Sequence, residues 1–339
     1  MTLTLALLIA AQAQAWQGSI DSLAKLDQFS GVVLVARNGA PLFEHAYGMA
    51  DRESKRPNDL ETSFNLGSIN KLFTQIAIRQ LAAAPVGAQH GAPLNIDSSL
   101  GRAWPDYPNP GVRNVTIRQI LEHTSGIQGN VFAAPPGKTR HDVRTLADYF
   151  ELFKNEPLQF APGTREQYSN AGYIVLGLLI ERLSGENYYD YVRRHILEPA
   201  GMTRTASWPV DSLPPNTAIG YTKGGERAAE GGEGAALTRN TELLPGRGSS
   251  AGGGYSTAHD LLRLLNALRA HKIDQAPEAG MVGIAGGAPG LNAAMEGDLE
   301  GGYDVIVLAN LDPPAAGQVS RLIRQALGVA PPQPGRLRS

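Results

Sequence analysis

Two polar residues stand three positions apart in the segment FNLGSINKLFTQ, residues 64–75: Ser68 and Lys71. In a helix, residues i and i+3 share a face with Cβ atoms about 5–6 Å apart, so the amine can reach the hydroxyl. Burial would lower the pKa of the lysine and make its neutral amine a usable base for a serine nucleophile. The spacing predicts a Ser-Lys pair for acyl transfer. The alternative is two polar residues on the solvated face of a helix.

A second Ser-x-x-Lys pair, Ser22 and Lys25, shows how little the spacing establishes by itself. Ordinary residue usage produces about one such match by chance in a chain of this length. Ser22 and Lys25 precede the first predicted hairpin in a polar stretch, which indicates a solvated helix face. Ser68 follows that hairpin and begins an apolar helix, which would present it at the edge of a sheet.

A Ser-Lys pair also needs a group that relays protons and donors that stabilise an oxyanion. Tyr168 and Asn170 form a Tyr-x-Asn pattern where a loop leads into a predicted helix, so both side chains can point into one cleft. The alternative for Tyr168 is an aromatic packing residue. A second Tyr-x-Asn, Tyr107 to Asn109, lies in the Pro-rich segment WPDYPNPG, a composition typical of a turn.

Strand patterns occur at both ends of the chain and helical patterns lie between them. Two hairpins are predicted, one around the type I′ turn signal Asn38-Gly39 and one over residues 291–312. Hydrophobic periodicity and capping signals predict helices after residue 68 and over residues 116–126, 170–185, 188–197, 256–271 and 315–327. The economical arrangement is an α+β fold. One antiparallel sheet is built from both chain ends and flanked by helices, with an inserted, mainly helical subdomain.

The N-terminus reads MTLTLALLIAAQAQAWQG. A short apolar run that ends in Ala13-Gln14-Ala15 is typical of a signal peptide cleaved before Trp16, although no basic residue precedes it; the alternative is a buried N-terminal helix. No other segment is long and apolar enough to cross a bilayer. We therefore expect a periplasmic or secreted protein. It would have a signal peptide over 1–15, one domain over 16–330 and a tail over 331–339. Within the domain, the sheet subdomain would cover about 20–67 and 245–328 and the helical subdomain about 75–245.

Composition excludes several classes of function. The 339 residues are 42% hydrophobic and 18% charged, as in a soluble globular protein, and the net charge of −2 argues against a nucleic-acid binder. There is no cysteine, which excludes disulfides, thiolate catalysis and Cys-based metal sites. The seven histidines show no metal-binding spacing, and no Gly-x-Ser-x-Gly elbow occurs. No metal, cofactor or partner protein is expected.

Several runs together resemble the serine β-lactamase and penicillin-binding-protein-like hydrolases, in the branch of class C β-lactamases, D,D-carboxypeptidases, D-aminopeptidases and family VIII esterases. In chain order these runs are FNLGSINKLFTQ, ILEHTSGI, PGTREQYSNAGYIVLGLLIE, SSAGGGYSTAHDLLR and GGAPGLNA followed by DVIVLANLD. The resemblance covers about residues 20–328. It implies a β-lactamase/transpeptidase-like fold in which Ser68 forms the acyl-enzyme, Lys71 is its base and Tyr168 relays protons. Asn170 would bind substrate, and His123 would be structural.

The chain departs from this pattern at the third motif, a Lys-Thr-Gly or His-x-Gly on a strand that faces the serine. Here Ile284 occupies the Lys/His position and Gly286 the glycine position. The resemblance implies main-chain oxyanion donors at Ser68 and Gly287, so Ile284, Gly286 and Gly287 are predicted to bind substrate. A Lys-x-Gly match at Lys223 lies well before the returning strands. The short segment before Ile284 also suggests a missing or reduced strand.

The resemblance implies a serine hydrolase that cleaves ester or amide bonds of small acyl or peptide substrates, like an esterase or a D-amino-acid peptidase. A β-lactamase or D,D-carboxypeptidase is the alternative within this class, disfavoured because a cation is absent at residue 284. The alternative from another class is a non-catalytic binding protein that retains the fold. The altered third motif favours that alternative, and the presence of Ser68, Lys71 and Tyr168 together opposes it.

Overall fold

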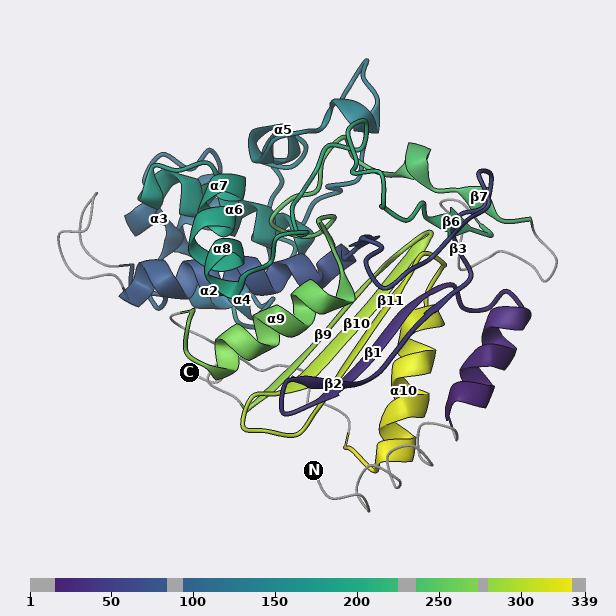
Figure 1. The fold of residues 1–339 in the computed structure, drawn as a ribbon. Coiled ribbons are helices and arrows are strands. Elements are labelled where there is room, and N and C mark those ends of the chain that lie inside the picture. The colour runs from purple at the N-terminus through teal and green to yellow at the C-terminus, as the bar shows by residue number, and fades with distance from the viewer. Residues whose placement is uncertain (1–15, 84–93, 225–235, 274–279, 331–339) are drawn as a thin grey trace.

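The computed structural model describes residues 16–83, 94–224, 236–273 and 280–330. Its centre is a five-stranded antiparallel sheet with the strand order β2-β1-β11-β10-β9 (Figure 1). These strands are β1 (Gly31–Arg37), β2 (Ala40–Tyr47), β9 (Met281–Ala288), β10 (Leu291–Asp298) and β11 (Tyr303–Ala309). The predicted signal peptide and the tail after residue 330 lie outside the described residues.

Both predicted hairpins are present in this sheet. At the β1–β2 turn, Asn38 and Gly39 have φ angles of 51° and 75°, the left-handed pair that a type I′ turn requires. Strand β1 then pairs antiparallel with β11, from Gly31 opposite Ala309 to Arg37 opposite Tyr303. This pairing joins the two ends of the chain, so the predicted α+β architecture is confirmed.

Each face of the sheet is covered by helices, because alternate residues of a strand point to opposite faces. Val33 and Val35 of β1 pack with the helix over residues 16–25 and with α10 (Ala315–Leu327). Val32 and Leu34 face a larger core that includes α2 (Asn70–Ala83) and α9 (Ala258–Arg269). Figure 1 shows α10 and α9 on either side of the strands. The sheet is thus the middle layer of the domain.

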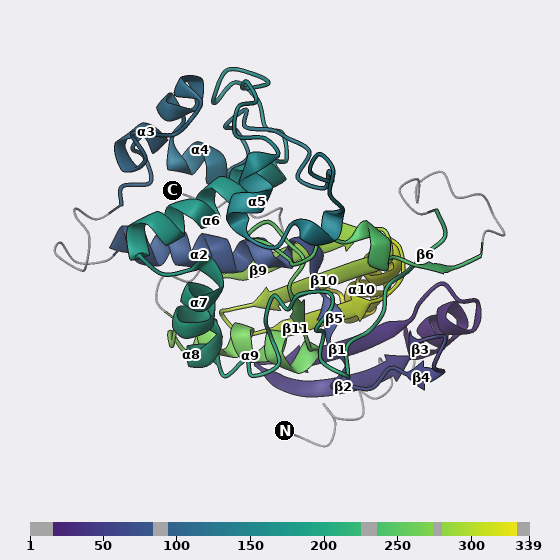
Figure 2. The same ribbon diagram turned by 90° about the horizontal axis from the view of Figure 1, so that it is seen from above.

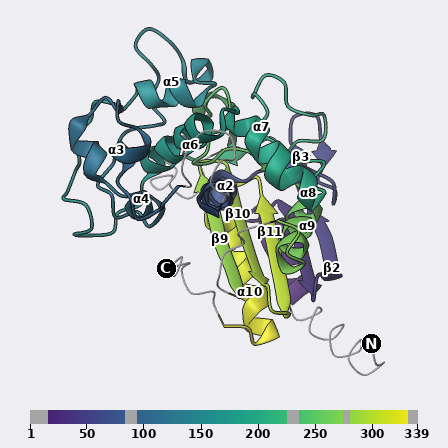
Figure 3. The ribbon, with the colours of Figure 1, turned by 90° about the vertical axis from the view of Figure 1, so that its left-hand side faces the viewer.

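The inserted segment between β5 and β8 is mainly helical, as predicted. Its helices are α2, α3 (Leu100–Ala103), α4 (Ile117–Leu121), α5 (Leu146–Glu151), α6 (Asn170–Ser184), α7 (Tyr188–Val192) and α8 (Glu198–Ala200). The group α3, α4, α5 and α6 lies beside the sheet, and α2 runs between this group and the strands (Figures 2 and 3). The nucleophile helix is therefore placed at the junction of the two subdomains.

Three two-stranded ladders complete the described structure. They pair β3 (Met49–Asp51) with β4 (Arg56–Pro57), β5 (Phe64–Asn65) with β8 (Tyr255–Ser256), and β6 (Tyr221–Thr222) with β7 (Thr238–Arg239). The β5–β8 ladder has a direct role in positioning the site, because it holds the chain just before Ser68 against the segment that leads into α9.

Helix α4 begins as predicted and ends earlier. The side chains and backbone of Thr116 and Gln119 form a capping box at its start. The helix stops at Leu121 because His123 adopts a left-handed conformation with φ 59°, so Gly126 is not its terminating residue. Gly126 serves another contact: a methyl group there would lie 2.4 Å from the carbonyl oxygen of Phe160.

The helix predicted over residues 188–197 continues past Pro199. After α7 a π-helical turn spans Arg193–Leu197 and leads into α8, with Pro199 in its first turn. Proline is tolerated there because its missing N–H is not needed at the start of a helix. The helical run therefore extends beyond the predicted end at Leu197, and Gly201 ends it with φ 72°.

Strand β9 carries Ile284 and lies at one edge of the sheet. It pairs with β10 along its whole length, from Met281 opposite Asp298 to Ala288 opposite Leu291. The short segment that suggests a missing or reduced strand before β9 spans residues 271–282, and its residues 274–279 lie outside the described residues, so that prediction is not tested. In the described ranges, every helix falls short of the length and hydrophobicity that a bilayer-spanning segment needs.

Candidate active site

Ser68 lies in a 3₁₀ turn, Gly67–Ile69, between strand β5 and helix α2. Gly67 has φ 50°, and its backbone N–H donates to Oδ1 of Asn65, so a glycine-dependent turn changes the chain direction at the end of β5. Ile69 is fully buried and fixes the turn in the core. Ser68 is thus in the turn before the helix, two positions before α2 begins at Asn70.

The structure brings the predicted catalytic groups together. Nζ of Lys71 lies 3.2 Å from Oγ of Ser68, and Oη of Tyr168 donates to the same Oγ at 2.6 Å. Oδ1 of Asn170 accepts from Nζ of Lys71 at 2.8 Å. Residues 100 positions apart along the chain therefore meet at one hydroxyl, and the Ser-Lys-Tyr arrangement predicted from the motifs is present.

Lys71 is buried in a pocket of acceptors and aromatic rings. Its side chain is 3% exposed, and beyond Ser68 and Asn170 it donates to the carbonyl oxygen of Ala251 at 2.5 Å. Its Nζ lies 4.6 Å from the ring centre of Tyr168 and 5.3 Å from that of Tyr173. Removal from water lowers the pKa of Lys71 to about 7, so a large fraction of the amine is neutral at neutral pH.

Tyr168 extends from the loop before α6 with its ring 52% exposed. Burial of its hydroxyl end raises the pKa of Tyr168, and the hydrogen bond to Ser68 opposes that shift. The phenol therefore stays protonated at neutral pH and can donate. Its ring packs on the ring of His123, with 4.6 Å between their centroids.

His123 holds the loop that carries Tyr168. Its Nδ1 accepts from the backbone N–H of Ser169 at 3.1 Å, and its ring also stacks on Tyr173. Burial, together with the nearby charge of Lys71, lowers the pKa of His123 to about 4, so the ring is neutral and Nδ1 remains an acceptor. The contacts fit the structural interpretation of His123 from the sequence.

A cavity of about 530 Å³ opens at Ser68. Tyr168, Asn170 and Gly287 line it together with Ser68, so four of the predicted site residues face one space. The rest of its wall is largely apolar, with contributions from residues that include Val131, Phe132, Val210, Leu243, Leu244 and Pro289. Among the described residues that line the cavity, Arg140 carries the one charged side chain.

Gly286 and Ile284 do not belong to the described lining of this cavity, in contrast to the prediction. A methyl group on Gly286 would lie 2.1 Å from the carbonyl oxygen of Leu66 and 2.8 Å from the backbone nitrogen of Ser68. Glycine is therefore required for β9 to approach the nucleophile turn. Ile284, on the same face of β9, is half-buried against the core, where an apolar side chain packs in place of a cation.

Gly287 lies next to the same turn. Its backbone nitrogen would be 3.0 Å from a methyl group on Gly67, and Gly67, Ser68 and Gly287 all line the cavity. The backbone amides of Ser68 and Gly287 are thus on adjacent segments at the base of the cavity. This placement is compatible with the oxyanion role that the resemblance implies.

The described residues of the second Ser-x-x-Lys, the second Tyr-x-Asn and the Lys-x-Gly match do not line the Ser68 cavity. Ser22 and Lys25 are exposed on the helix over residues 16–25, as predicted. Tyr107 is buried in the core, and Asn109 caps the 3₁₀ turn that follows it, as expected of a Pro-rich turn. Lys223 is exposed and is not among the residues that line the cavity.

Two contributors to the site were missed by sequence reasoning. The carbonyl oxygen of Ala251 accepts from Lys71, and the ring of Tyr173 lies beside the amine. A main-chain carbonyl leaves no trace in residue type, so Ala251 had no signal. Tyr173 stands three residues after Asn170, on the same helical face, and that spacing could have identified it.

Within the described ranges, no cluster of three or more histidine, aspartate or glutamate side chains is arranged to hold a metal ion. The side chains that meet at Ser68 are a nucleophile, a buried amine and a phenol. Such a set suits acyl transfer through a covalent intermediate.

The fold and this site define the class of serine hydrolases that pair an antiparallel sheet with a helical subdomain and place a Ser-Lys-Tyr site between them. The chain belongs to the Beta-lactamase family, because its residues 19–283 match the sequence model of that family. Membership defines the family and its fold; it does not specify a substrate.

Named relatives fit this assignment. The chain is similar to penicillin-binding protein 4* of Bacillus subtilis (strain 168), 33% identical over 56% of this chain and 40% of the relative. It is also similar to esterase EstB of Burkholderia gladioli, 32% identical over 71% of this chain and 65% of the esterase. The chain thus spans about half the length of these curated relatives. Among solved structures, the penicillin binding protein from Bacillus halodurans superposes with a TM-score of 0.74 at 29% identity, covering 94% of this chain and 99% of that one.

Proposed function

We propose that this protein is a serine hydrolase that cleaves small esters or amides through an acyl-Ser68 intermediate. One observation carries the proposal: Oγ of Ser68 is within hydrogen-bonding distance of both Nζ of Lys71, at 3.2 Å, and Oη of Tyr168, at 2.6 Å. A serine that served only packing would not need a buried amine whose pKa is lowered to about 7.

The groups support a two-stage reaction. Neutral Lys71 takes the proton of the Ser68 hydroxyl, and Oγ attacks the substrate carbonyl carbon. The negative charge that develops on the carbonyl oxygen faces the backbone amides of Ser68 and Gly287. Tyr168 donates its proton to the leaving alcohol or amine and recovers a proton from Lys71. The C–O or C–N bond breaks and leaves an acyl ester on Ser68.

The second stage reverses the proton transfers. A water molecule attacks the acyl carbonyl and gives up one proton to the Tyr168–Lys71 pair. Oγ of Ser68 leaves as the acid is released, and that proton restores the serine hydroxyl. Splitting one difficult displacement into two easier ones is the advantage of the covalent intermediate.

The apolar wall supports small acyl esters as the preferred substrates. Phe132, Leu243 and Leu244 offer hydrocarbon contact near Ser68. Ile284 packs in the core at the position where the family pattern has a cation, which removes one anchor for the carboxylate of a β-lactam. The similarity to EstB supports the esterase side of the proposal, and the similarity to penicillin-binding proteins keeps D-alanyl peptides in the test panel.

The test is covalent labelling followed by turnover. Wild type and Ser68→Ala are treated with a fluorophosphonate and measured by intact mass, and then assayed on p-nitrophenyl esters, nitrocefin and D-alanyl peptides. The expected result is one added label in wild type, located on the Ser68 peptide, none in Ser68→Ala, and ester turnover only in wild type. Ser22→Ala is the matched control. Ser22 is the exposed serine of the second Ser-x-x-Lys, so this variant should be labelled on Ser68 as fully as wild type is.

The alternative of a non-catalytic binding protein predicts a different outcome. Such a protein would leave Ser68 unlabelled and would turn over none of the substrates, although its fold and melting temperature were intact. Turnover unchanged in Ser68→Ala would likewise overturn the proposed mechanism.

We also propose a periplasmic or secreted location, supported by the apolar run and the Ala-x-Ala pattern before Trp16. N-terminal sequencing of protein from the periplasmic and culture fractions tests this. The expected first residue is Trp16. A protein that keeps its initial Met1 and stays in the cytoplasm would contradict it.

A further inference from the structure

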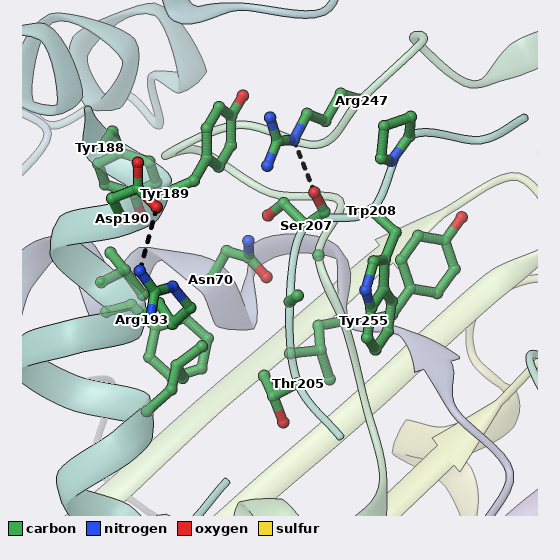
Figure 4. A pocket seen from close by; sticks show the side chains of 17 residues that line it. Asn70, Tyr188, Tyr189, Asp190, Arg193, Thr205, Ser207, Trp208, Arg247 and Tyr255 are labelled. Atoms are coloured by element: carbon green, nitrogen blue, oxygen red, sulfur yellow. Dashed lines mark hydrogen bonds and ion pairs between the residues drawn. The ribbon is translucent and has the colours of Figure 1, made fainter. Parts of the chain in front are cut away.

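A second cavity, of about 260 Å³, lies beside helix α2 (Figure 4). It is bounded by the start of α2, by α7 and by the segment over residues 205–209. The segment 248–253 contributes several residues to the Ser68 cavity, whereas its neighbours Arg247 and Gly254 line the second one. A single stretch of chain therefore separates the two spaces.

Asn70 presents a buried polar atom to this cavity. It stands between Ser68 and Lys71 in sequence and is 3% exposed, and Figure 4 shows its amide projecting toward the segment that carries Ser207. Its Nδ2 has a long contact of 3.4 Å to the carbonyl oxygen of Ser249. Among the described residues, no donor reaches its Oδ1. A buried acceptor without a partner costs about 1–3 kcal/mol, which a ligand donor would offset.

Arg247 supplies a cation on the same wall. Its guanidinium lies 3.6 Å from the ring centre of Tyr189, and its Nε donates to the carbonyl oxygen of Ser207 at 2.7 Å. No carboxylate of the described residues forms an ion pair with Arg247, whereas Arg193 at the same cavity is paired with Asp190. The charge of Arg247 is thus held in place and uncompensated, a favourable setting for an anion.

The rest of the cavity wall favours a ligand with an aromatic ring. Phe73, Tyr189, Trp208 and Tyr255 line the cavity, and the rings of Trp208 and Tyr255 lie 6.3 Å apart. An apolar cavity of about 150 Å³ is enough to bind benzene, so this one has room for a single substituted ring. Aromatic faces and an arginine at one side match a flat acid better than an aliphatic one.

We propose that the second cavity is a binding site for a compact aromatic carboxylic acid that carries a ring hydroxyl or amino group. The carboxylate pairs with Arg247, the ring packs against Trp208 and Phe73, and the ring donor reaches Oδ1 of Asn70. Among the described residues, the site shares only Tyr255 with the lining of the Ser68 cavity, and it contacts Asn70, one of the two residues between the nucleophile and its base. It does not depend on the proposed hydrolase activity.

Calorimetric titration with 4-hydroxybenzoate tests the site, with benzoate as the probe without a donor and phenol as the probe without a carboxylate. The expected result is saturable 1:1 binding of 4-hydroxybenzoate, with benzoate and phenol each weaker by several-fold. Arg247→Met should weaken 4-hydroxybenzoate about tenfold and leave phenol unchanged. The unchanged phenol affinity shows that the cavity itself is intact in the variant.

Arg194→Met is the control, because Arg194 follows the cavity residue Arg193 in the chain, is paired with Glu186 and does not itself line the cavity. It should bind 4-hydroxybenzoate as wild type does. Repeating the titration on fluorophosphonate-labelled protein locates the site, since binding should survive a filled Ser68 cavity. No turnover is needed, so an inactive enzyme leaves the result readable. Absence of saturable binding in the millimolar range, or equal loss in both arginine variants, would overturn the proposal.

Discussion

The hydroxyl of Tyr168 lies 2.6 Å from the hydroxyl of Ser68, although one hundred residues separate them in the chain. The contact crosses the junction of the two subdomains: Ser68 follows β5 at the sheet, and Tyr168 precedes α6 in the helical group. Lys71 lies beneath both and contacts the ring of Tyr168 as well as Oγ of Ser68. The hydrogen bonds that surround Ser68 therefore form only where one subdomain packs against the other.

The pH dependence should follow Lys71. Its pKa is lowered to about 7, and the neutral amine is the base, so kcat/KM for a p-nitrophenyl ester should rise as pH increases through about 7. Because burial raises the pKa of Tyr168 above that of an ordinary tyrosine, loss of its proton should add no falling limb in the neutral range. Lys71→Arg should remove the rising limb together with the activity, because guanidinium stays protonated. A limb centred near pH 4 would instead implicate His123.

Removing the hydroxyl of Tyr168 should slow turnover without unfolding the protein. Tyr168→Phe keeps the half-exposed ring and its stacking on His123, and should lower kcat by about 10²–10⁴-fold. The melting temperature should stay within a few degrees of wild type, because little buried surface changes. Tyr107→Phe, in the other Tyr-x-Asn, should retain full kcat. Equal losses in the two variants would show that the effect is structural.

Gly286 should be intolerant of a side chain. The methyl group of Gly286→Ala would lie 2.1 Å from the carbonyl oxygen of Leu66, which is main chain and cannot move aside without displacing the nucleophile turn. We expect a loss of about 1–3 kcal/mol in the free energy of unfolding, measured in urea, together with a loss of ester hydrolysis.

Gly317→Ala is the control for that experiment. Gly317 lies within α10 and has open space where the methyl group would be. Alanine there should raise the free energy of unfolding by about 0.5–1 kcal/mol and leave activity unchanged. A fully stable, active Gly286→Ala would contradict the close approach of β9 to Ser68.

A cation at residue 284 should shift substrate preference toward acids. Ile284 lies on the same face of β9 as Gly286, two residues earlier, so the long side chain of Ile284→Lys can extend toward the cavity while its stem stays on the core. KM for an ester with a free carboxylate should fall about tenfold, which corresponds to about 1.4 kcal/mol, with KM for its neutral analogue unchanged. Ile284→Met, of similar length without charge, should show no such preference.

The sequence predicted much of this architecture for physical reasons that are local. Asn38-Gly39 specifies a turn with two left-handed residues, and the Thr116–Gln119 box specifies the start of a helix. Continuous apolar, β-branched runs over β1 and β11 predicted two strands at opposite ends of the chain. The predicted ends of two helices were wrong. Helix α4 ends at Leu121, because His123 adopts a left-handed conformation before Gly126 is reached. The helix predicted to end at Leu197 continues through a π-helical turn into α8, which contains Pro199.

Residue types by themselves determined which groups could react. The amine, hydroxyl and phenol of Lys71, Ser68 and Tyr168 and the lack of cysteine could all be read from the chain. Only the tertiary structure decided that the carbonyl oxygen of Ala251 accepts from Lys71. It also decided that Gly286 packs against the main chain of Leu66 and Ser68, and that Ile284 packs on the core. These properties depend on main-chain atoms and on distances between segments far apart in sequence, and such distances are set by the packing of the whole core.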